Sequence, residues 1–259
     1  MPLASIVTPT QAHNADHLPA AWQSLRDAAL PAGWELEWLV QEDGAAPRLR
    51  GVVPVDPRVR YDALGVQAGG PTTRNLALAR AVGDIVLGLD HDDEVVPGGP
   101  AALLHALTTD REAVWACGRA ELLLQGGQTW VKPDVFPPGR LEAGAVSAWY
   151  SAHNDFPFPA AFTAYRREHL VAIGGWPAVV RSADAVLLAA VNDRWPGRWV
   201  DRIVARYRRW PAQASVQPDD IRIRDLPHVR GVITQRAAAV ERIFSSSDGA
   251  PPTMSSRRD

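Results

Sequence analysis

An apolar segment that ends abruptly in carboxylates is the feature that most constrains this chain. Residues 85–89 form a run of strand length, and Asp90, Asp92 and Asp93 follow within four positions. A buried strand that emerges at the edge of a sheet would place these carboxylates together. Mg²⁺ and Mn²⁺ take oxygen ligands and are commonly held by one or two carboxylates plus substrate phosphates. The segment therefore predicts a metal–diphosphate site, with an acidic, solvated turn as the alternative.

Strands and helices are expected to alternate through the first half of the chain. Residues 4–10, 34–40 and 59–64 have the composition of short strands. A helix capped by Asn14 or Asp16 should follow the first strand. A second helix should end at Gly83 and bury an apolar stripe that consists of Leu76, Leu78, Ala79 and Val82. This order predicts an α/β fold with a mainly parallel central sheet flanked by helices, in a single domain.

The expected sheet brings three polar loops to one edge. In open parallel sheets, ligands bind beyond the carboxyl ends of the strands. Residues Thr8 to Thr10, Glu42 to Asp43 and Asp90 to Asp93 each follow or end such a strand. We expect these three loops to line one binding crevice.

The second half of the chain has a less regular pattern. Residues 100–107 and 166–173 indicate helices, 114–124 and 199–207 indicate strands, and 131–144 indicate an irregular stretch rich in Pro and Gly. Ser182 or Asp184 should begin another helix, and a final helix is expected over 225–244. Residues 245–259 have the composition of a disordered tail.

Composition excludes several classes of protein. The 259 residues are 46% hydrophobic and 22% charged, with a net charge of −2, so neither nucleic acid nor an anionic membrane is expected as the main partner. The single cysteine, Cys117, excludes an intramolecular disulfide and a multi-cysteine zinc site. Because no apolar run approaches the roughly 18 residues of a membrane span, we expect a cytoplasmic protein. Its oligomeric state is left open.

Several motifs occur in the order of a known family. Val7-Thr8-Pro9 ends the first strand, and Glu42-Asp43-Gly44 ends the second. Thr73-Arg74-Asn75 begins a helix, and Asp90-His91-Asp92-Asp93 ends the next strand. Together these segments resemble family-2 inverting glycosyltransferases of the GT-A fold, and the resemblance covers roughly residues 4–215. It implies a nucleotide-sugar-binding half at 1–110 and an acceptor-binding half at 111–244 of one GT-A domain.

The resemblance implies a role for each matching position. Thr8, Pro9 and Asp43 would contact the nucleotide base, with Thr10 and Glu42 beside them in the crevice. Arg74 would contact the base or the diphosphate, and Asp90 would lie near the ribose. Asp92, with Asp90, would hold Mn²⁺ or Mg²⁺, which neutralises the diphosphate leaving group. Asp93 is expected to order the turn.

The acceptor half carries the expected catalytic base. The family has a Glu-Asp pair that supplies a base to deprotonate the acceptor hydroxyl, and the chain has Ala183-Asp184 at this place. Asp184 is therefore the predicted base, ahead of Asp155 and His153, which are expected near the acceptor. Trp176 and Trp149 are candidates to stack on the acceptor.

The motif that closes the family pattern departs from it at one position. Tyr207 to Ser215 resembles Tyr-Arg-x-His-Pro-x-Gln-x-Ser, but Trp210 replaces the His, and an indole cannot ligate a metal. Arg208 or Arg209 would then bind the diphosphate.

The expected reaction moves a sugar from a nucleotide-diphosphate donor, with UDP preferred, to a hydroxyl of a small-molecule or glycan acceptor. A nucleotide-sugar-binding protein with impaired catalysis is one alternative, because of Ala183 and Trp210. A sugar-nucleotide pyrophosphorylase is another, although residues 8–14 lack the Gly-rich basic loop that it requires. A dehydrogenase is disfavoured, because no Gly-x-Gly-x-x-Gly follows a strand.

Overall fold

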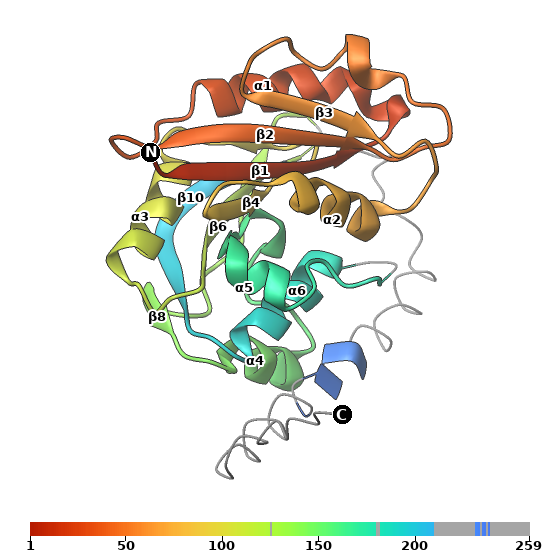
Figure 1. The fold of residues 1–259 in the computed structure, drawn as a ribbon. Helices are drawn as coiled ribbons and strands as arrows, with labels where there is room; N and C mark the ends of the chain where they lie inside the picture. Colours follow the sequence, from red (N-terminus) through yellow and green to blue (C-terminus); the bar gives the residue numbers. More distant parts are fainter. Residues whose placement is uncertain (125, 180–181, 210–230, 234, 237, 239–259) are drawn as a thin grey trace, which may run out of the picture.

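The computed structural model describes residues 1–259 except 125, 180–181, 210–230, 234, 237 and 239–259. The predicted closing motif beyond Arg209, including Trp210, lies outside the described residues, as do the predicted tail and most of the predicted helix at 225–244. Within the described part, the fold is α/β, with a curled sheet between two layers of helices (Figure 1).

The sheet contains ten strands in the described residues, in the order β3-β2-β1-β4-β9-β6-β10-β5, with β7 paired to β6 and β8 to β10. The strands are β1 (Leu3–Thr10), β2 (Glu35–Glu42), β3 (Val59–Ala63), β4 (Ile85–Gly88), β5 (Glu94–Val95), β6 (Trp115–Leu123), β7 (Thr129–Val131), β8 (Gly139–Leu141), β9 (Ala164–Arg166) and β10 (Gly197–Arg208).

Among the described strands the sheet is mainly parallel, and antiparallel pairing occurs only in its second half. β1, β2, β3 and β4 are mutually parallel neighbours. Beyond β4, strand β9 runs antiparallel to both β4 and β6, while β6 and β10 are parallel. The mainly parallel sheet that the alternation predicted is thus confirmed, with an antiparallel insertion where the two halves join.

The α-helices are α1 (Leu18–Arg26), α2 (Gly70–Arg80), α3 (Gly99–Thr109), α4 (Ala145–His153), α5 (Arg167–Ala172) and α6 (Ala183–Asn192). Helices α2, α4, α5 and α6 contribute to the hydrophobic core on one face of the sheet, and α1 and α3 to the core on the other (Figure 1). Along β1 the side chains alternate between these cores: Ile6 belongs to the α1–α3 side and Val7 to the α2–α6 side.

Two expectations about the early helices were wrong in detail. A 3₁₀ helix, Ala12–His17, contains Asn14 and Asp16, and α1 begins only at Leu18. Pro19 explains this start, because proline is tolerated in the first helical turn and not farther along. In α2 the buried residues are Thr73, Arg74, Ala77 and Leu78, whereas Val82 is 61% exposed. The inward face of α2 therefore starts with polar side chains that point toward the site.

The second half contains elements that the sequence did not predict. Helix α4 and strand β9 were missed, and β8 lies within the stretch 131–144 that was expected to be irregular. Strand β9 has only three residues, which is too short to show a clear alternating pattern. The expected starts of α5 and α6 agree with the structure to within one residue.

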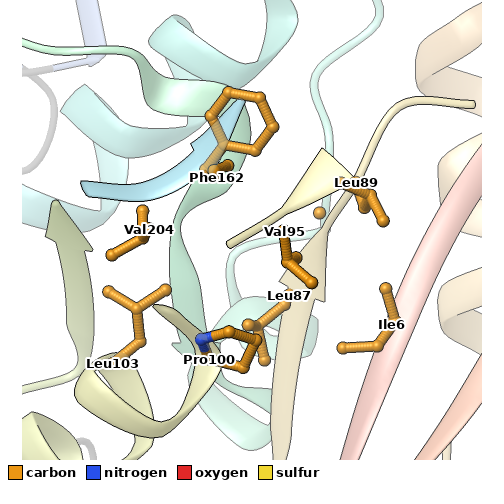
Figure 2. A pocket seen from close by; sticks show the side chains of 10 residues that line it. Ile6, Leu87, Leu89, Val95, Pro100, Leu103, Phe162 and Val204 are labelled. Carbon is orange, nitrogen blue, oxygen red and sulfur yellow. The ribbon is translucent and has the colours of Figure 1, made fainter. Parts of the chain in front are cut away.

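A small apolar cavity lies beneath β4. It has a volume of ≈ 10 Å³ and is lined only by apolar residues, including Ile6, Leu87, Val95 and Phe162 (Figure 2). A space of this size holds about one water molecule and offers that water no polar partner. The polar chemistry of the protein lies instead at the carboxyl ends of the strands.

Candidate active site

The structure brings the three predicted loops together. The Leu89 amide donates to the carbonyl of Val7 at 3.1 Å, which ties the end of β4 to β1. The Asp43 amide donates to the carbonyl of Thr10 at 2.8 Å, which ties the end of β2 to β1. Because β1 lies between β2 and β4, its Thr-Pro-Thr end lies in the middle of the three strand ends, at the predicted binding crevice.

The residues at the end of β1 are buried. The Thr8 hydroxyl accepts a hydrogen bond of 2.8 Å from the indole N–H of Trp38, and Thr8 has 0% exposure. The Thr10 hydroxyl is also buried and has no hydrogen-bond partner among the described residues. Pro9 between them is buried as well. Thr10 therefore has a hydroxyl without a hydrogen-bond partner but, at 2% exposure, no open surface in this structure, whereas Thr8 already has a structural partner.

Glu42 holds a neighbouring loop in place. Its carboxylate accepts hydrogen bonds from the amides of Arg48 and Leu49 and from the Tyr61 hydroxyl, at 2.5 to 3.2 Å. Burial raises the pKa of the Tyr61 phenol, and the bond to Glu42 raises it further. These contacts support a structural role for Glu42 at the rim of the crevice.

Asp43 organises the loop that leads into α2. Its Oδ1 accepts hydrogen bonds from the amides of Ala68 and Gly69, and its Oδ2 accepts from the Gln11 side chain at 3.2 Å. Gly69 is left-handed at φ 83°, which turns its amide toward the carboxylate. Asp43 and Gln11 thus lie side by side at the predicted base subsite. Gln11 was not predicted from the sequence.

The three aspartates of the acidic turn after β4 make different contacts. Arg74 donates to Asp90 Oδ1 at 2.5 Å. Asp92 is 4% exposed, and its main-chain carbonyl accepts from Arg208 Nε at 3.1 Å. Asp93 Oδ1 accepts from the Arg208 amide at 2.9 Å, while its Oδ2 is buried with no partner among the described residues. As expected, Asp93 orders the turn.

Burial controls the protonation of two groups in this turn. It raises the pKa of Asp93 well above the ordinary value, and the neighbouring Asp92 and Asp90 add to the rise. Burial also lowers the pKa of His91, although Asp92 and Asp90 oppose this. His91 is therefore neutral near pH 7 and adds no charge to the turn.

Asp184 lies beside Arg74 of α2, in the predicted donor half. It is in the first turn of α6, and its Oδ2 is 3.5 Å from Arg74 Nη2, the same nitrogen that bonds Asp90. Its Oδ1 accepts a hydrogen bond of 2.7 Å from the Trp176 indole. Burial raises the pKa of Asp184, Arg74 and Trp176 lower it and Asp90 raises it, with a net rise. Arg74 thus bridges one carboxylate from each half.

The predicted acceptor residues separate into two groups. Trp176 is 2% exposed, so in this structure its ring faces the core, and the stacking role expected for it has no exposed surface. Trp149 and His153 of α4 stack on each other with ring centroids 3.7 Å apart, and His153 is exposed. Asp155, nearby in the chain, pairs with Lys132 of the segment after β7. No described contact joins this second group to Asp184.

The two predicted diphosphate arginines also differ. Arg208 donates to Glu94 Oε1 at 2.6 Å in addition to its contacts with the acidic turn, so it stabilises that turn. Arg209 donates its amide to the Leu123 carbonyl, and its guanidinium lies 6.0 Å from the Tyr207 ring centroid. Arg209 therefore has the freer side chain for an anion, immediately before the residues that lie outside the described part.

The described residues offer limited ligands for a metal. Among them, no three or more His, Cys, Asp or Glu side chains lie close enough together to hold a metal ion by themselves. Asp92 and Asp90 lie in one turn, but Asp90 already bonds Arg74. This set fits a cation such as Mg²⁺ that keeps water and substrate oxygens as its other ligands.

The sequence missed the side-chain partners of Asp184. Asn75 bonds the main chain of Trp176, 101 positions away, and Trp176 in turn bonds Asp184. The adjacency of Asn75 to Arg74 in the Arg-Asn motif was a signal for Asn75. No local pattern could have paired it with Trp176.

None of the helices in the described residues is long and apolar enough to span a membrane.

Among curated proteins compared with the chain, no sequence matches it. Solved structures do resemble it at 17% identity. The S. aureus TarS 1–349 complex with UDP-GlcNAc has a TM-score of 0.66 over 95% of this chain and 71% of that one. The TarS 1–349 structure without a named ligand has a TM-score of 0.60 over 80% and 60%.

The chain is shorter than these structural relatives. It spans 60% of the first of them and 37% of the longer TarS chain, for which the TM-score is 0.57 at 17% identity. At this identity the likeness establishes the fold, which is GT-A-like. A sequence model of one family, described as glycosyl transferase family 2, matches residues 5–170. The match covers the crevice, the Arg-Asn motif and the acidic turn, and the chain belongs to glycosyl transferase family 2.

Proposed function

We propose that the protein transfers a sugar, with inversion and with the help of a divalent ion, from a UDP-sugar to a hydroxyl of a small or glycan acceptor. The observation that carries this proposal is the position of Arg74 between Asp90 of the donor half and Asp184 of the acceptor half. A transferase must hold the donor anomeric carbon next to the group that activates the acceptor. Arg74 contacts one carboxylate on each side: Asp90, which would lie near the donor, and Asp184, which would activate the acceptor.

Asp184 would act as the general base. The acceptor O–H proton passes to the carboxylate as the acceptor oxygen bonds to the anomeric carbon, and the bond from that carbon to the diphosphate oxygen breaks on the opposite face. Two features support this role. The side chain of Asp184 retains 21% exposure, and the raised pKa makes its carboxylate a stronger base. Arg74 lowers the pKa of Asp184 and so opposes the rise that burial causes.

Asp92 and Asp90 would hold Mn²⁺ or Mg²⁺, together with diphosphate oxygens and water. When bound, the ion would neutralise the charge that develops on the diphosphate leaving group. Arg74 is close enough to Asp90 to contact the same diphosphate, and a guanidinium suits bidentate phosphate contacts. Arg209 is a second candidate for that charge.

UDP is the proposed nucleotide. Support comes from crystal structures of the fold relative TarS with UDP and with UDP-GlcNAc. Thr10, Gln11 and Asp43 provide hydrogen-bonding groups at the end of the crevice where the base would lie. The acceptor would approach from the side of α4, where His153 and part of Trp149 are exposed to solvent.

A second candidate function is nucleotide-sugar binding without efficient transfer. Ala183 occupies the position of the family Glu and is 5% exposed, so Asp184 has no acidic neighbour there. Asp184 also pairs with Arg74, which a base must leave in order to accept a proton. Turnover separates the two candidates.

The first experiment is a thermal-shift screen of UDP, GDP, dTDP and their sugars, each with Mn²⁺, Mg²⁺ or EDTA. A ligand that binds only the native state raises the midpoint of unfolding. We expect the largest shift with UDP compounds and a smaller one in EDTA. Hits are then incubated with acceptors, and NMR of the product establishes the anomeric configuration. Absence of a shift with every nucleotide would contradict the proposal, and retention of configuration would contradict inversion.

A further inference from the structure

We propose that Asn75 and Trp176 are positioning residues that fix the carboxylate of Asp184. This inference rests on the proposed function, because it assumes that Asp184 is the base. Asn75 holds the main chain of Trp176, and the Trp176 indole holds one oxygen of Asp184. The donor-side helix α2 would thereby set the orientation of a group on the acceptor-side helix α6.

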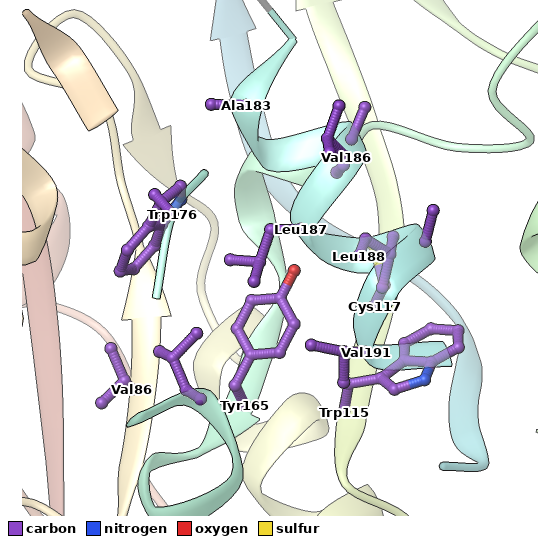
Figure 3. Packing of buried hydrophobic residues seen from close by; sticks show 14 of the residues in the cluster. Val86, Trp115, Cys117, Tyr165, Trp176, Ala183, Val186, Leu187, Leu188 and Val191 are labelled. Carbon is purple, nitrogen blue, oxygen red and sulfur yellow. The ribbon is translucent and has the colours of Figure 1, made fainter. Parts of the chain in front are cut away.

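The contact between Trp176 and Asp184 fixes a rotatable carboxylate. The indole nitrogen donates to Oδ1 at 2.7 Å, whereas Arg74 faces Oδ2 at 3.5 Å. Each oxygen therefore has a different partner, which defines the plane of the carboxylate. The Trp176 ring is buried in the core that also contains Val86 of β4 and Leu187 of α6 (Figure 3). A donor on such a ring has little freedom, because its position is set by packing.

Asn75 provides the second part of the arrangement. Its Oδ1 accepts from the Trp176 amide at 2.8 Å, and its Nδ2 donates to the Trp176 carbonyl at 2.9 Å. One side chain thus satisfies both polar groups of a main-chain unit in a loop between α5 and α6. An amide is required for this pair of bonds, because Asp offers no donor when ionised and Leu offers neither group.

Gly175 is independent evidence that the loop accommodates Asn75. Its φ of +69° lies in the left-handed region that favours glycine. A Cβ at this position would lie 2.2 Å from Asn75 Oδ1, closer than any ordinary contact. Any other residue at position 175 would displace the Asn75 side chain from the Trp176 amide.

Two consecutive residues of α2, Arg74 and Asn75, would both influence Asp184. Arg74 contacts Asp184 directly, and Asn75 reaches it through Trp176. A diphosphate that draws Arg74 away from Asp184 would leave the Trp176 bond in place. The base would then keep its orientation when its ion pair is released for catalysis.

Trp176→Phe is the most direct test, because it removes the N–H and keeps a buried aromatic ring. Trp199→Phe is the matched control: Trp199 belongs to the same core and is 3% exposed, and its indole nitrogen has no partner among the described residues. With UDP-GlcNAc as donor and release of UDP as readout, we expect kcat of Trp176→Phe to fall on the order of 10- to 100-fold. KM for the donor should change by less than about twofold, since Arg74 is intact.

The pH profile adds a readout that a purely structural role would not move. The Trp176 bond lowers the pKa of Asp184, so its loss should shift the acidic limb of kcat toward higher pH. Asn75→Ala should reproduce the fall in kcat. The double variant should be no slower than Trp176→Phe, because residues that act through one path are not additive.

An NMR measurement tests the same contact without any substrate. The ¹H–¹⁵N indole signal of Trp176, assigned by its absence in Trp176→Phe, should move in Asp184→Asn and in Asn75→Ala. The Trp199 signal should stay in place in both. An unmoved Trp176 signal would overturn the inference, and so would equal kcat values for Trp176→Phe and Trp199→Phe.

Asp184→Asn distinguishes this inference from the proposed function. If Asp184→Asn abolishes UDP release while Trp176→Phe matches its control, the positioning inference fails and the base remains. If Asp184→Asn retains full turnover, the assignment of the base fails, and the positioning role fails with it.

Discussion

The predicted donor half and the surface around α4, where the acceptor is expected, satisfy their polar groups in different ways. In the donor half, buried side chains bond across neighbouring strands, as Glu37 does with Ser5 and Thr8 with Trp38. Around α4, Lys132 pairs with the exposed Asp155 at the surface. Buried polar networks specify one arrangement, whereas surface pairs contribute little stability. The strand ends of the predicted donor half are therefore held by buried hydrogen bonds, and substitutions around α4 are expected to change stability least.

The largest effect on stability is expected where the halves meet. Arg74→Met leaves Asp90 and Asp184 without their shared cation in a site where Arg74 is 9% exposed. Breaking a buried ion pair by removing one partner costs roughly 3–5 kcal/mol. Urea unfolding at pH 7 measures this loss. Arg26→Met is the control, since its pair with Asp27 is exposed and should contribute little to stability. Equal losses in the two variants would show that the junction is not a buried site.

Glu37→Gln probes the network inside the donor half. Burial raises the pKa of Glu37, but hydrogen bonds from the Val82 amide, Ser5 and Arg60 outweigh it and hold the pKa below its ordinary value of 4.5. The ionised form therefore stabilises the fold above about pH 4.5, and this contribution is lost as the pH falls through the lowered pKa. We expect Glu37→Gln to cost roughly 2–3 kcal/mol at pH 7 and less at pH 3. A loss that does not vary with pH would contradict this role.

Thr8→Val distinguishes a structural role of Thr8 from a role in nucleotide binding. Valine removes the acceptor of the Trp38 indole N–H, and a buried donor without a partner costs roughly 1–2 kcal/mol. Thr8→Ser keeps the hydroxyl and should lose less. If Thr8 also contacts the base, UDP affinity measured by calorimetry will fall in Thr8→Val beyond what Thr8→Ser shows. Unchanged stability in Thr8→Val would mean that the Trp38 bond contributes nothing.

The smallest effect on stability is expected on the acceptor side. His153 is exposed and stacks on Trp149, so His153→Ala should change the free energy of unfolding by less than about 0.5 kcal/mol. UDP affinity should be unchanged, because His153 has no described contact with the donor crevice. If the acceptor binds here, KM for the acceptor will rise a few-fold. A fall in UDP affinity would instead place His153 on the donor side.

The same difference explains what the sequence could predict. In the predicted donor half, β1, β2 and β4 carry apolar side chains in a strand pattern and end at polar motifs, so these three strands and their convergence follow from local pattern. Of the apolar stripe predicted for α2, Leu78 is buried, but Ala79 and Val82 are exposed, and the buried face begins with Thr73 and Arg74. In the acceptor half, β9 and α4 depend on long-range pairing and packing. The sequence showed which residues could carry chemistry. It could not show which of them pair, because partners such as Asn75 and Trp176 are 101 positions apart.

Single-turnover release of UDP from UDP-GlcNAc by Asp184→Asn tests the central claim most directly. Asparagine can still accept the Trp176 hydrogen bond at Oδ1, so the site should remain assembled. We expect the rate to fall by roughly 10²- to 10⁴-fold, the usual contribution of a general base. UDP affinity, measured alongside, should stay within about threefold of the unaltered protein. A rate equal to that of the unaltered protein, with the same affinity, would contradict the assignment of Asp184 as the base.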